Sequence, residues 1–240
     1  MIGAFLNALG ILLGALAALA WREPFSARTQ NWFRSTLGGL TIFFGLRLVW
    51  ENTGGTATTI LRQLFIALLA VGLGHWLGRR LRLQKMSNWL GRRAAERLGA
   101  AQKNPPGKPM DGFAAATVLF CAAPLGILGA VTDGLAGDFY PLALKAVMDG
   151  LAMAGFVPLF RWPVALAALP VFIFLTALAA AVNRFALPAL AAHHLGEPTA
   201  AAAGLVMCAV SLVILGARRV ELANFLPALL LAPGLARLIE

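Results

Sequence analysis

The chain has 240 residues, of which 60% are hydrophobic and only 12% are charged. Soluble domains are about 45–50% apolar and about 25% charged, so this composition excludes an ordinary soluble globular domain. The formal net charge of +10 would suit a nucleic-acid partner, but the basic residues gather between apolar stretches, as they do in membrane proteins. We therefore expect an integral membrane protein in contact with the lipid bilayer, and no nucleic-acid partner.

The apolar stretches predict an all-α polytopic membrane protein with about eight transmembrane helices. A spanning helix needs about 20 residues, and the sequence lacks the short alternating segments of an outer-membrane β-barrel. Unpaired backbone groups are costly in lipid, so each span must be helical. The expected spans are, in chain order, 1–21, 36–50, 60–78, 112–131, 140–160, 164–183, 199–217 and 220–238.

Small residues follow one face of the first span, at spacings of three and four. The glycines of this stripe are Gly3, Gly10 and Gly14, and Asn7 lies among them. Such faces let helices approach closely, so we interpret Asn7 as a packing residue first and as a ligand contact second. Small-residue helix faces would also suit a homo-oligomer.

A long basic connection divides the chain into three parts. We expect an N-terminal three-helix half at 1–78, a basic cytoplasmic amphipathic linker at 79–110 and a C-terminal five-helix half at 111–240. Pro105 and its neighbours end the linker.

The linker itself predicts an amphipathic helix on the membrane surface. Apolar residues recur there at helical spacing: Met86, Trp89, Leu90, Ala94 and Leu98. Its basic residues would hold anionic lipids electrostatically. The headgroup-binding residues that we expect are Arg79, Arg80, Arg82, Arg92 and Arg93.

Proline and glycine interrupt the fourth span. Pro124 lacks an N–H group, and Gly126 and Gly129 lower the helix propensity just beyond it. The span should therefore break at Pro124 and free backbone carbonyls near Cys121. Broken helices at membrane depth are tolerated where they are buried in protein or line a water-filled cavity.

The fifth span carries a basic and an acidic residue, Lys145 and Asp149, which share one helical face. Ionisable groups at membrane depth cost about 2.5–3.5 kcal/mol on insertion scales, so they usually face a bundle interior or a polar pathway. A charge pair that only fixes packing and a functional site both remain open. For Asp133, near the end of the fourth span, an exposed turn is favoured over a place in the pathway.

The first and last spans share a pattern that suggests an inverted repeat. Asn7 and Asn224 are each followed by leucines at the same three offsets, and with eight spans the two helices cross in opposite directions. Chance remains an alternative, because leucine is common here. The alignment pairs Gly10 with Pro227 and predicts a local irregularity in both helices.

Charge placement orients the expected spans. If the first span enters from outside, the inner connections hold fifteen of the 20 Lys and Arg residues. We therefore expect both termini outside, on the periplasmic side of a bacterial inner membrane.

The sequence offers little sign of cofactor chemistry. Cys121 and Cys208 lie inside apolar spans, where buried small hydrophobes are favoured over redox or metal ligands. Adjacent His193 and His194 point to different faces of a helix, so they do not suggest a metal site. Without a nucleotide-binding motif or a hydrolase motif, we expect no enzyme, no cofactor and no metal.

Four runs resemble a known family: LNALGILLG, FCAAPLGILGAVTDGLAGD, LALKAVMDG and NFLPALLLAP. They are similar to the YqgA/YdfK family of bacterial inner-membrane proteins, over essentially the whole chain. The resemblance implies several transmembrane helices. It implies no activity, because the family is classed as a domain of unknown function.

Together these features predict a multi-pass inner-membrane transporter or channel for a small ion or polar solute. The alternative is a non-transporting membrane scaffold or sensor that acts through the basic surface helix. The expected ion pathway consists of Asp149, Lys145, Asp133, Asn7, Asn224, Cys121 and Pro124.

Overall fold

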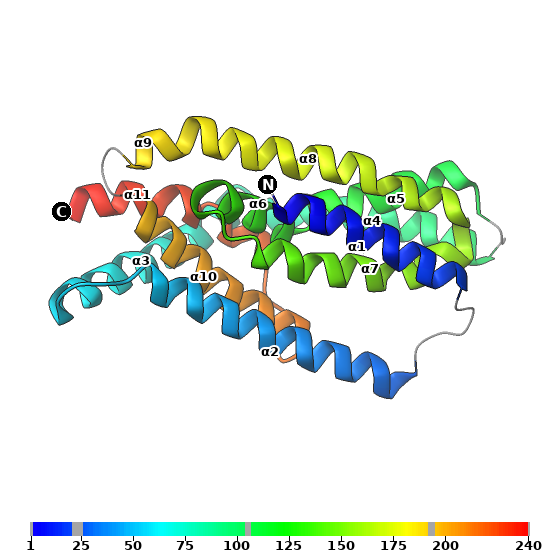
Figure 1. Ribbon diagram of the computed structural model, residues 1–240, viewed down its shortest axis with the longest axis horizontal. Coiled ribbons are helices and arrows are strands. Elements are labelled where there is room, and N and C mark those ends of the chain that lie inside the picture. The colour runs from blue at the N-terminus through cyan, green and yellow to red at the C-terminus, as the bar shows by residue number, and fades with distance from the viewer. Residues whose placement is uncertain (1, 21–25, 104–106, 192–194, 240) are drawn as a thin grey trace. The chain divides into compact units, whose positions relative to one another are not determined.

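A computed structural model describes residues 2–20, 26–103, 107–191 and 195–239, so the features predicted at Pro105, His193 and His194 lie outside the described residues. Within these ranges the chain is all-helical, as predicted (Figure 1). The elements are α1 (Ile2–Ala20), α2 (Ala27–Glu51), α3 (Ala57–Arg80), α4 (Leu83–Lys103), α5 (Pro109–Ala122), α6 (Pro124–Ala136), α7 (Tyr140–Phe160), the 3₁₀ helix η1 (Trp162–Ala167), α8 (Ala168–Ala181), the π-helix η2 (Val182–Ala186), α9 (Leu187–Ala191), α10 (Gly196–Ile214), the 3₁₀ helix η3 (Leu222–Phe225) and α11 (Ala228–Ile239).

The candidate membrane spans are fewer than the eight predicted. In the described part of the chain, six helical stretches are long and apolar enough to cross a bilayer: α1, α3, α7, Trp162–Ala186, α10 and Leu222–Ile239. The bent pair α5 and α6 makes a seventh if it forms one span. The predicted second span lies in α2, which is not among these candidates, so the count of eight is not confirmed.

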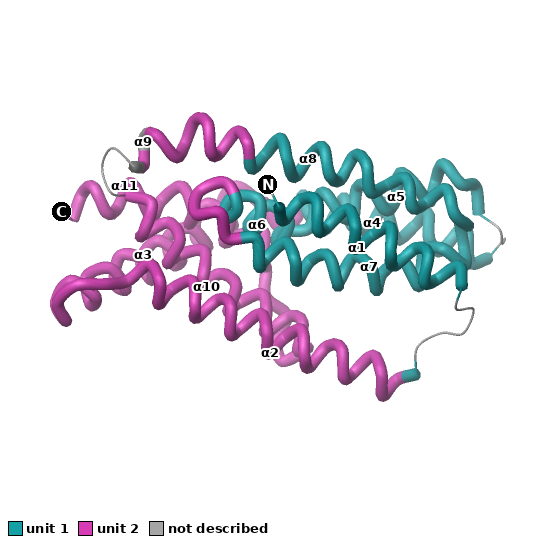
Figure 2. The backbone as a smooth tube through the Cα atoms, viewed as in Figure 1, with its two compact units in different colours: residues 1–26, 86–133, 139–179 teal, residues 27–85, 134–138, 180–240 magenta. Residues whose placement is uncertain are grey.

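Contacts divide the chain into two compact units (Figure 2). Unit 1 comprises residues 1–26, 86–133 and 139–179. Unit 2 comprises residues 27–85, 134–138 and 180–240. Both units join segments that are distant in sequence, whereas the three predicted parts follow chain order; that division stays a prediction.

In unit 1, α1 packs along α7. The contact depends on small residues: a Cβ atom added to Gly10 would lie 2.5 Å from the carbonyl oxygen of Ala146, and one added to Gly14 would collide with the backbone of Gly150. Such close approach gains dispersion energy along the whole contact. The predicted packing role of this stripe is therefore confirmed.

In unit 2, α2 packs along α10, and α3 packs against η3 and α11. Glycines again permit the approach, with Gly45 against Gly204 and with Gly78 against the backbone of Asn224. The small-residue faces of α1, α2 and α3 are thus occupied within the chain. A homo-oligomer formed through these faces is not supported.

The expected irregularity of α1 at Gly10 is wrong, because α1 is a continuous helix from Ile2 to Ala20. The chain is irregular at Pro227, which lies between η3 and α11. Helix α1 belongs to unit 1 and α11 to unit 2, so the inverted-repeat relation stays a prediction.

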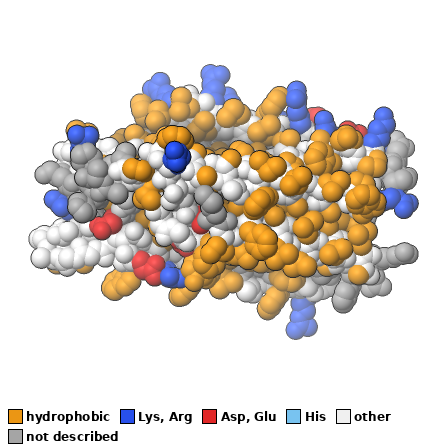
Figure 3. Space-filling model, turned by 45° about the horizontal axis from the view of Figure 1, so that its top comes forward, with side chains coloured by type: hydrophobic (Ala, Val, Ile, Leu, Met, Phe, Trp, Pro, Cys, Tyr) orange, Lys and Arg blue, Asp and Glu red, His pale blue; other side chains and the backbone are white. Residues whose placement is uncertain are grey.

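Large apolar side chains cover those parts of the helix surfaces that do not pack against another helix. On α1, the side opposite α7 exposes Ile2, Phe5, Leu13 and Leu16 by more than half. Figure 3 shows hydrophobic side chains gathered over one face of the molecule, with most Lys and Arg side chains toward its margins. Exposed apolar area of this extent is typical of a surface that lipid covers.

Candidate functional site

The helix break lies where proline predicts it. Helix α5 ends at Ala122, α6 begins at Pro124, and their axes differ by 56°. Ala123 is extended between them, and α6 starts with a hydrogen bond from the Gly126 N–H to the Ala123 carbonyl (2.9 Å). In a continuous helix the carbonyl of Phe120 would accept a bond from residue 124, which has no N–H. The bend fits either a broken span or a re-entrant loop.

The buried charge pair lies on α7, and its two side chains meet as expected. Lys145 Nζ donates to Asp149 Oδ2, and the residues are only 2% and 7% exposed. Lys145 Nζ also lies 5.5 Å from the centre of the Phe120 ring, at the end of α5. Each charge lowers the burial cost of the other, so neither is left uncompensated.

Helix α1 adds an amide to the pair. Asn7 Nδ2 donates to Asp149 Oδ2 at 3.0 Å, across the α1–α7 contact. Asn7 Oδ1 is buried and has no hydrogen-bond partner among the described residues. Leaving a buried polar group unpaired costs about 1–3 kcal/mol. Asn7 therefore both orients the carboxylate and places an acceptor beside it.

Gly126 makes room for the lysine. A Cβ atom added to Gly126 would lie 2.7 Å from Lys145 Cε, so the lysine stem runs directly over the first turn of α6. The ammonium group therefore joins the helix break to Asp149. The predicted break and the predicted charge pair therefore lie together in unit 1.

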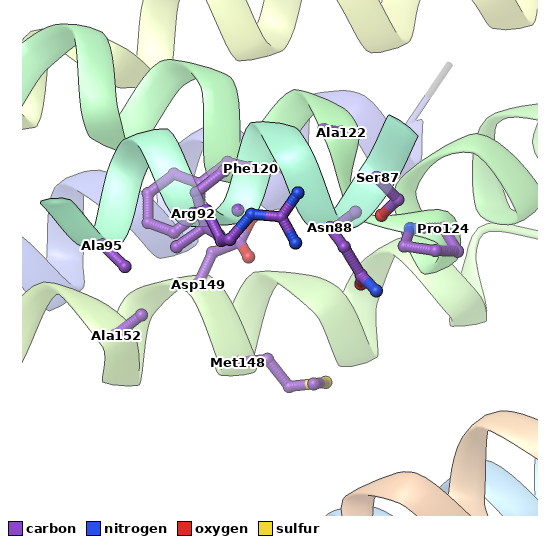
Figure 4. A pocket seen from close by; sticks show the side chains of 13 residues that line it. Ser87, Asn88, Arg92, Ala95, Phe120, Ala122, Pro124, Met148, Asp149 and Ala152 are labelled. Carbon is purple, nitrogen blue, oxygen red and sulfur yellow. The ribbon is translucent and has the colours of Figure 1, made fainter. Parts of the chain in front are cut away.

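An open pocket of about 680 Å³ borders this site (Figure 4). Its walls are one face of α4, the break between α5 and α6, and the Asp149 side of α7. The lining residues are Ser87, Asn88, Gly91, Arg92, Ala95, Leu119, Phe120, Ala122, Ala123, Pro124, Met148, Asp149 and Ala152. Figure 4 shows Arg92 and Asp149 together at this pocket. The site is thus open on one side and closed by the Lys145 pair on the other.

The pocket gathers some of the predicted pathway residues. Asp149 and Pro124 line it, and Lys145 and Asn7 join it through their bonds to Asp149. Cys121 is a half-buried free thiol at the end of α5 and is not among the lining residues.

Asp133 has a different position from the one favoured by its sequence context. It is only 6% exposed, and its Oδ2 accepts a hydrogen bond from the Gly3 N–H at 3.2 Å. The interpretation as an exposed turn is therefore wrong. A carboxylate at the first turn of α1 stabilises that helix end, because the free N–H groups there carry partial positive charge.

Asn224 lies in unit 2 and is hydrogen-bonded on both sides of its amide. Its Oδ1 accepts from the Gln84 N–H (3.1 Å), and its Nδ2 donates to Glu221 Oε2 (2.6 Å). In return, Gln84 Oε1 accepts from the Ala223 N–H (3.0 Å). These bonds tie the start of α4 to η3, which gives Asn224 a structural role within unit 2; it is not among the pocket's lining residues.

The α4 wall of the pocket was not predicted. The predicted amphipathic helix is present as α4, but its surface position stays a prediction. Ser87, Gly91 and Ala95 recur every four residues and form a face of small side chains, a pattern that the sequence does contain. Arg92, expected at lipid headgroups, lies on this face. Its neighbour Arg93 instead stacks on the Trp89 ring at 4.0 Å.

Comparisons with known proteins cover almost the whole chain. A family profile described as "Protein of unknown function (DUF554)" matches residues 2–237. The chain is 29% identical to "Uncharacterized protein YqgA" of Escherichia coli (strain K12) over 237 residues, which are 98% of this chain and 96% of that protein. It is 24% identical to "Uncharacterized membrane protein YdfK" of Bacillus subtilis (strain 168) over 242 residues, or 97% of this chain and 94% of that protein. No solved structure matches the chain.

Proposed function

Because the chain belongs to the DUF554 family of proteins of unknown function, we propose its function from the geometry of its own residues. It is a multi-pass inner-membrane transporter or channel for a small ion or polar solute. The solute binds in the pocket between α4, the α5–α6 break and Asp149.

One observation carries this proposal: a buried charge pair borders an open pocket at a helix break. A pair that served packing alone would need no open space beside it, whereas a solute site does. Asp149 instead lines about 680 Å³ of open space. Membrane transporters place solute sites at interrupted helices, where backbone groups without helical partners are available.

The pair also keeps its own charges compensated while a solute occupies the pocket. Asp149 Oδ2 accepts from both Lys145 and Asn7. A solute that enters the pocket without displacing Lys145 leaves this ion pair intact, so no buried charge is stranded.

The proposal includes eight crossings with both termini on the periplasmic side. Helix α2 supports this count, because it packs along the candidate span α10, with Gly38 beside Leu215 and Gly45 beside Gly204. These contacts run antiparallel over several turns, so α2 lies beside α10 along this length. Exposed Phe43 and Leu46 on α2 suit contact with lipid.

Cysteine labelling tests this topology. In a variant without natural cysteines, a cysteine placed at Lys103 should react only after the membrane is opened, because the basic connections favour the cytoplasmic side. The measurement is labelling of intact cells by a reagent that does not cross the membrane. Labelling at Lys103 in sealed cells would contradict the proposed orientation.

The second candidate is a scaffold or sensor that acts through α4. It is favoured by the exposed basic and aromatic side of this helix, where Arg93 stacks on Trp89. Such pairs suit the headgroup region of a membrane. A scaffold of this kind needs no open pocket, so filling the pocket separates the two functions.

Gly91→Leu should abolish solute flux and leave the fold intact. A Cβ atom at Gly91 meets nothing within 4 Å, so the leucine side chain extends into the pocket without a clash with the backbone. The measurement is flux in liposomes at equal protein content, together with the unfolding temperature.

Gly99→Leu is the matched control. Gly99 also lies on α4 with nothing within 4 Å of an added Cβ, and it is not among the residues of the pocket. Both changes raise the helix propensity by a similar amount. Equal flux in the Gly91 and Gly99 variants would remove the pocket from the transport pathway.

A further inference from the structure

The charges at the pocket are unequal. Its lining includes a basic residue, Arg92, and an acidic one, Asp149. Asp149 is already paired with Lys145 and hydrogen-bonded to Asn7. With Lys145 counted, the pocket and its immediate support carry two positive charges and one negative charge.

Arg92 is the residue that accounts for the excess of positive charge. In the part of the chain that the structure describes, it has no ion pair with a carboxylate. The other arginines of α4 differ: Arg93 stacks on Trp89, and Arg97 lies 3.9 Å from Asp111. A guanidinium group presents five donors in a planar fork that matches carboxylate and phosphate oxygens.

The other lining residues indicate the chemistry of the rest of a ligand whose charged group binds Arg92. Ser87 adds a neutral donor on α4 near Arg92, whereas Leu119, Met148 and Ala152 are apolar. A volume of about 680 Å³ is far larger than a halide needs and lies in the range of small organic ligands. A pocket with a charged end and an apolar end therefore suits an organic ligand better than an inorganic ion.

We infer that this pocket binds a small organic anion, with its carboxylate or phosphate group at Arg92 and its apolar part against Leu119, Met148 and Ala152. This inference rests on the proposed function and names the class of its solute. Arg92 is then the specificity-determining residue, since it selects the sign of the charge. The same chemistry occurs in free organic acids and in the headgroup and upper chains of anionic lipids.

Binding of a matched pair of probes tests the inference without a flux measurement. The full chain is placed in nanodiscs of phosphatidylcholine and titrated with hexanoate or with hexylammonium, which have similar apolar parts and opposite charges. Hexanoate should bind saturably, and hexylammonium should not. Arg92→Gln should weaken hexanoate binding about tenfold or more, the size expected for losing a charge-assisted contact.

Arg93→Gln is the control, because Arg93 is the neighbouring exposed arginine on α4 and is not a lining residue. Its hexanoate affinity should stay within about twofold of the wild type, below the tenfold step that corresponds to about 1.4 kcal/mol. Equal loss in both variants, or equal binding of hexylammonium, would overturn the inference. It would also be overturned if neither hexanoate nor an anionic lipid bound in an Arg92-dependent way.

A second experiment distinguishes a free organic acid from an anionic lipid as the ligand. If the ligand is a free solute, phosphatidylglycerol in the nanodiscs should leave hexanoate binding intact. If the ligand is a lipid, phosphatidylglycerol should compete with hexanoate. Arg92-dependent retention of phosphatidylglycerol without hexanoate binding assigns the pocket to the lipid. Binding without any flux would refute transport alone, whereas pocket-dependent flux without anion binding would refute the ligand class alone.

Discussion

Replacing either member of the Lys145–Asp149 pair alone should lower the free energy of unfolding by about 3–5 kcal/mol, because the remaining charge stays buried without its partner. The double variant Lys145→Met with Asp149→Asn should come close to wild-type stability. An asparagine at 149 keeps the shape of the side chain and can accept from Asn7 Nδ2. Its own amide can also donate to Asn7 Oδ1, which has no partner among the described residues.

A double-mutant cycle of denaturant unfolding measures this coupling. The surface pair Arg47 and Glu51 is the control, since it has the same four-residue spacing but side chains that are 37% and 49% exposed. Removal of that pair should cost at most about 1 kcal/mol. A Lys145–Asp149 cycle with no more coupling than this control would show that the charges are not buried together.

The second large effect concerns the contact between α1 and α7. Gly14→Ala should destabilise the protein by about 1–3 kcal/mol, because the added methyl group collides with the Gly150 backbone and forces the two helices apart. The separation should also weaken the bond from Asn7 to Asp149, which crosses the same contact. The measurement is thermal unfolding in lipid nanodiscs.

Gly155→Ala provides the comparison. Gly155 lies on α7, and an added Cβ there meets nothing within 4 Å. Its replacement should leave the protein unchanged or stabilise it by up to about 1 kcal/mol, from helix propensity alone. If the two alanine variants unfold at the same temperature, the close α1–α7 contact is not present in the protein.

The features that could be predicted from the sequence are those that arise locally. The break at Pro124 follows from a missing N–H, and the pairing of Lys145 with Asp149 follows from the helical repeat. The bond from Asn7 to Asp149 joins residues 142 positions apart, so nothing in either local sequence specifies it. The membrane class followed from composition, because lipid leaves few alternatives to apolar helices.

Other features depended on tertiary structure. Burial of Asp133 requires the N-terminus of α1 beside it, and the role of Arg92 requires α4 to lie along the helix break. Helix α2 shows a limit of a different kind. Its apolar part was predicted at 36–50, but the helix extends back to Ala27 through Arg28 and Arg34, which lowers its mean hydropathy.

Flux through the reconstituted protein tests the central claim most directly. Purified wild type, the Lys145→Met, Asp149→Asn double variant and an Arg47→Met, Glu51→Gln control are placed in liposomes at equal content and tested with cations, anions and protons. We expect flux of at least one solute in the wild type and in the control, and none in the stable double variant. The absence of any flux in the wild type, or undiminished flux in the double variant, would contradict a pathway through Asp149.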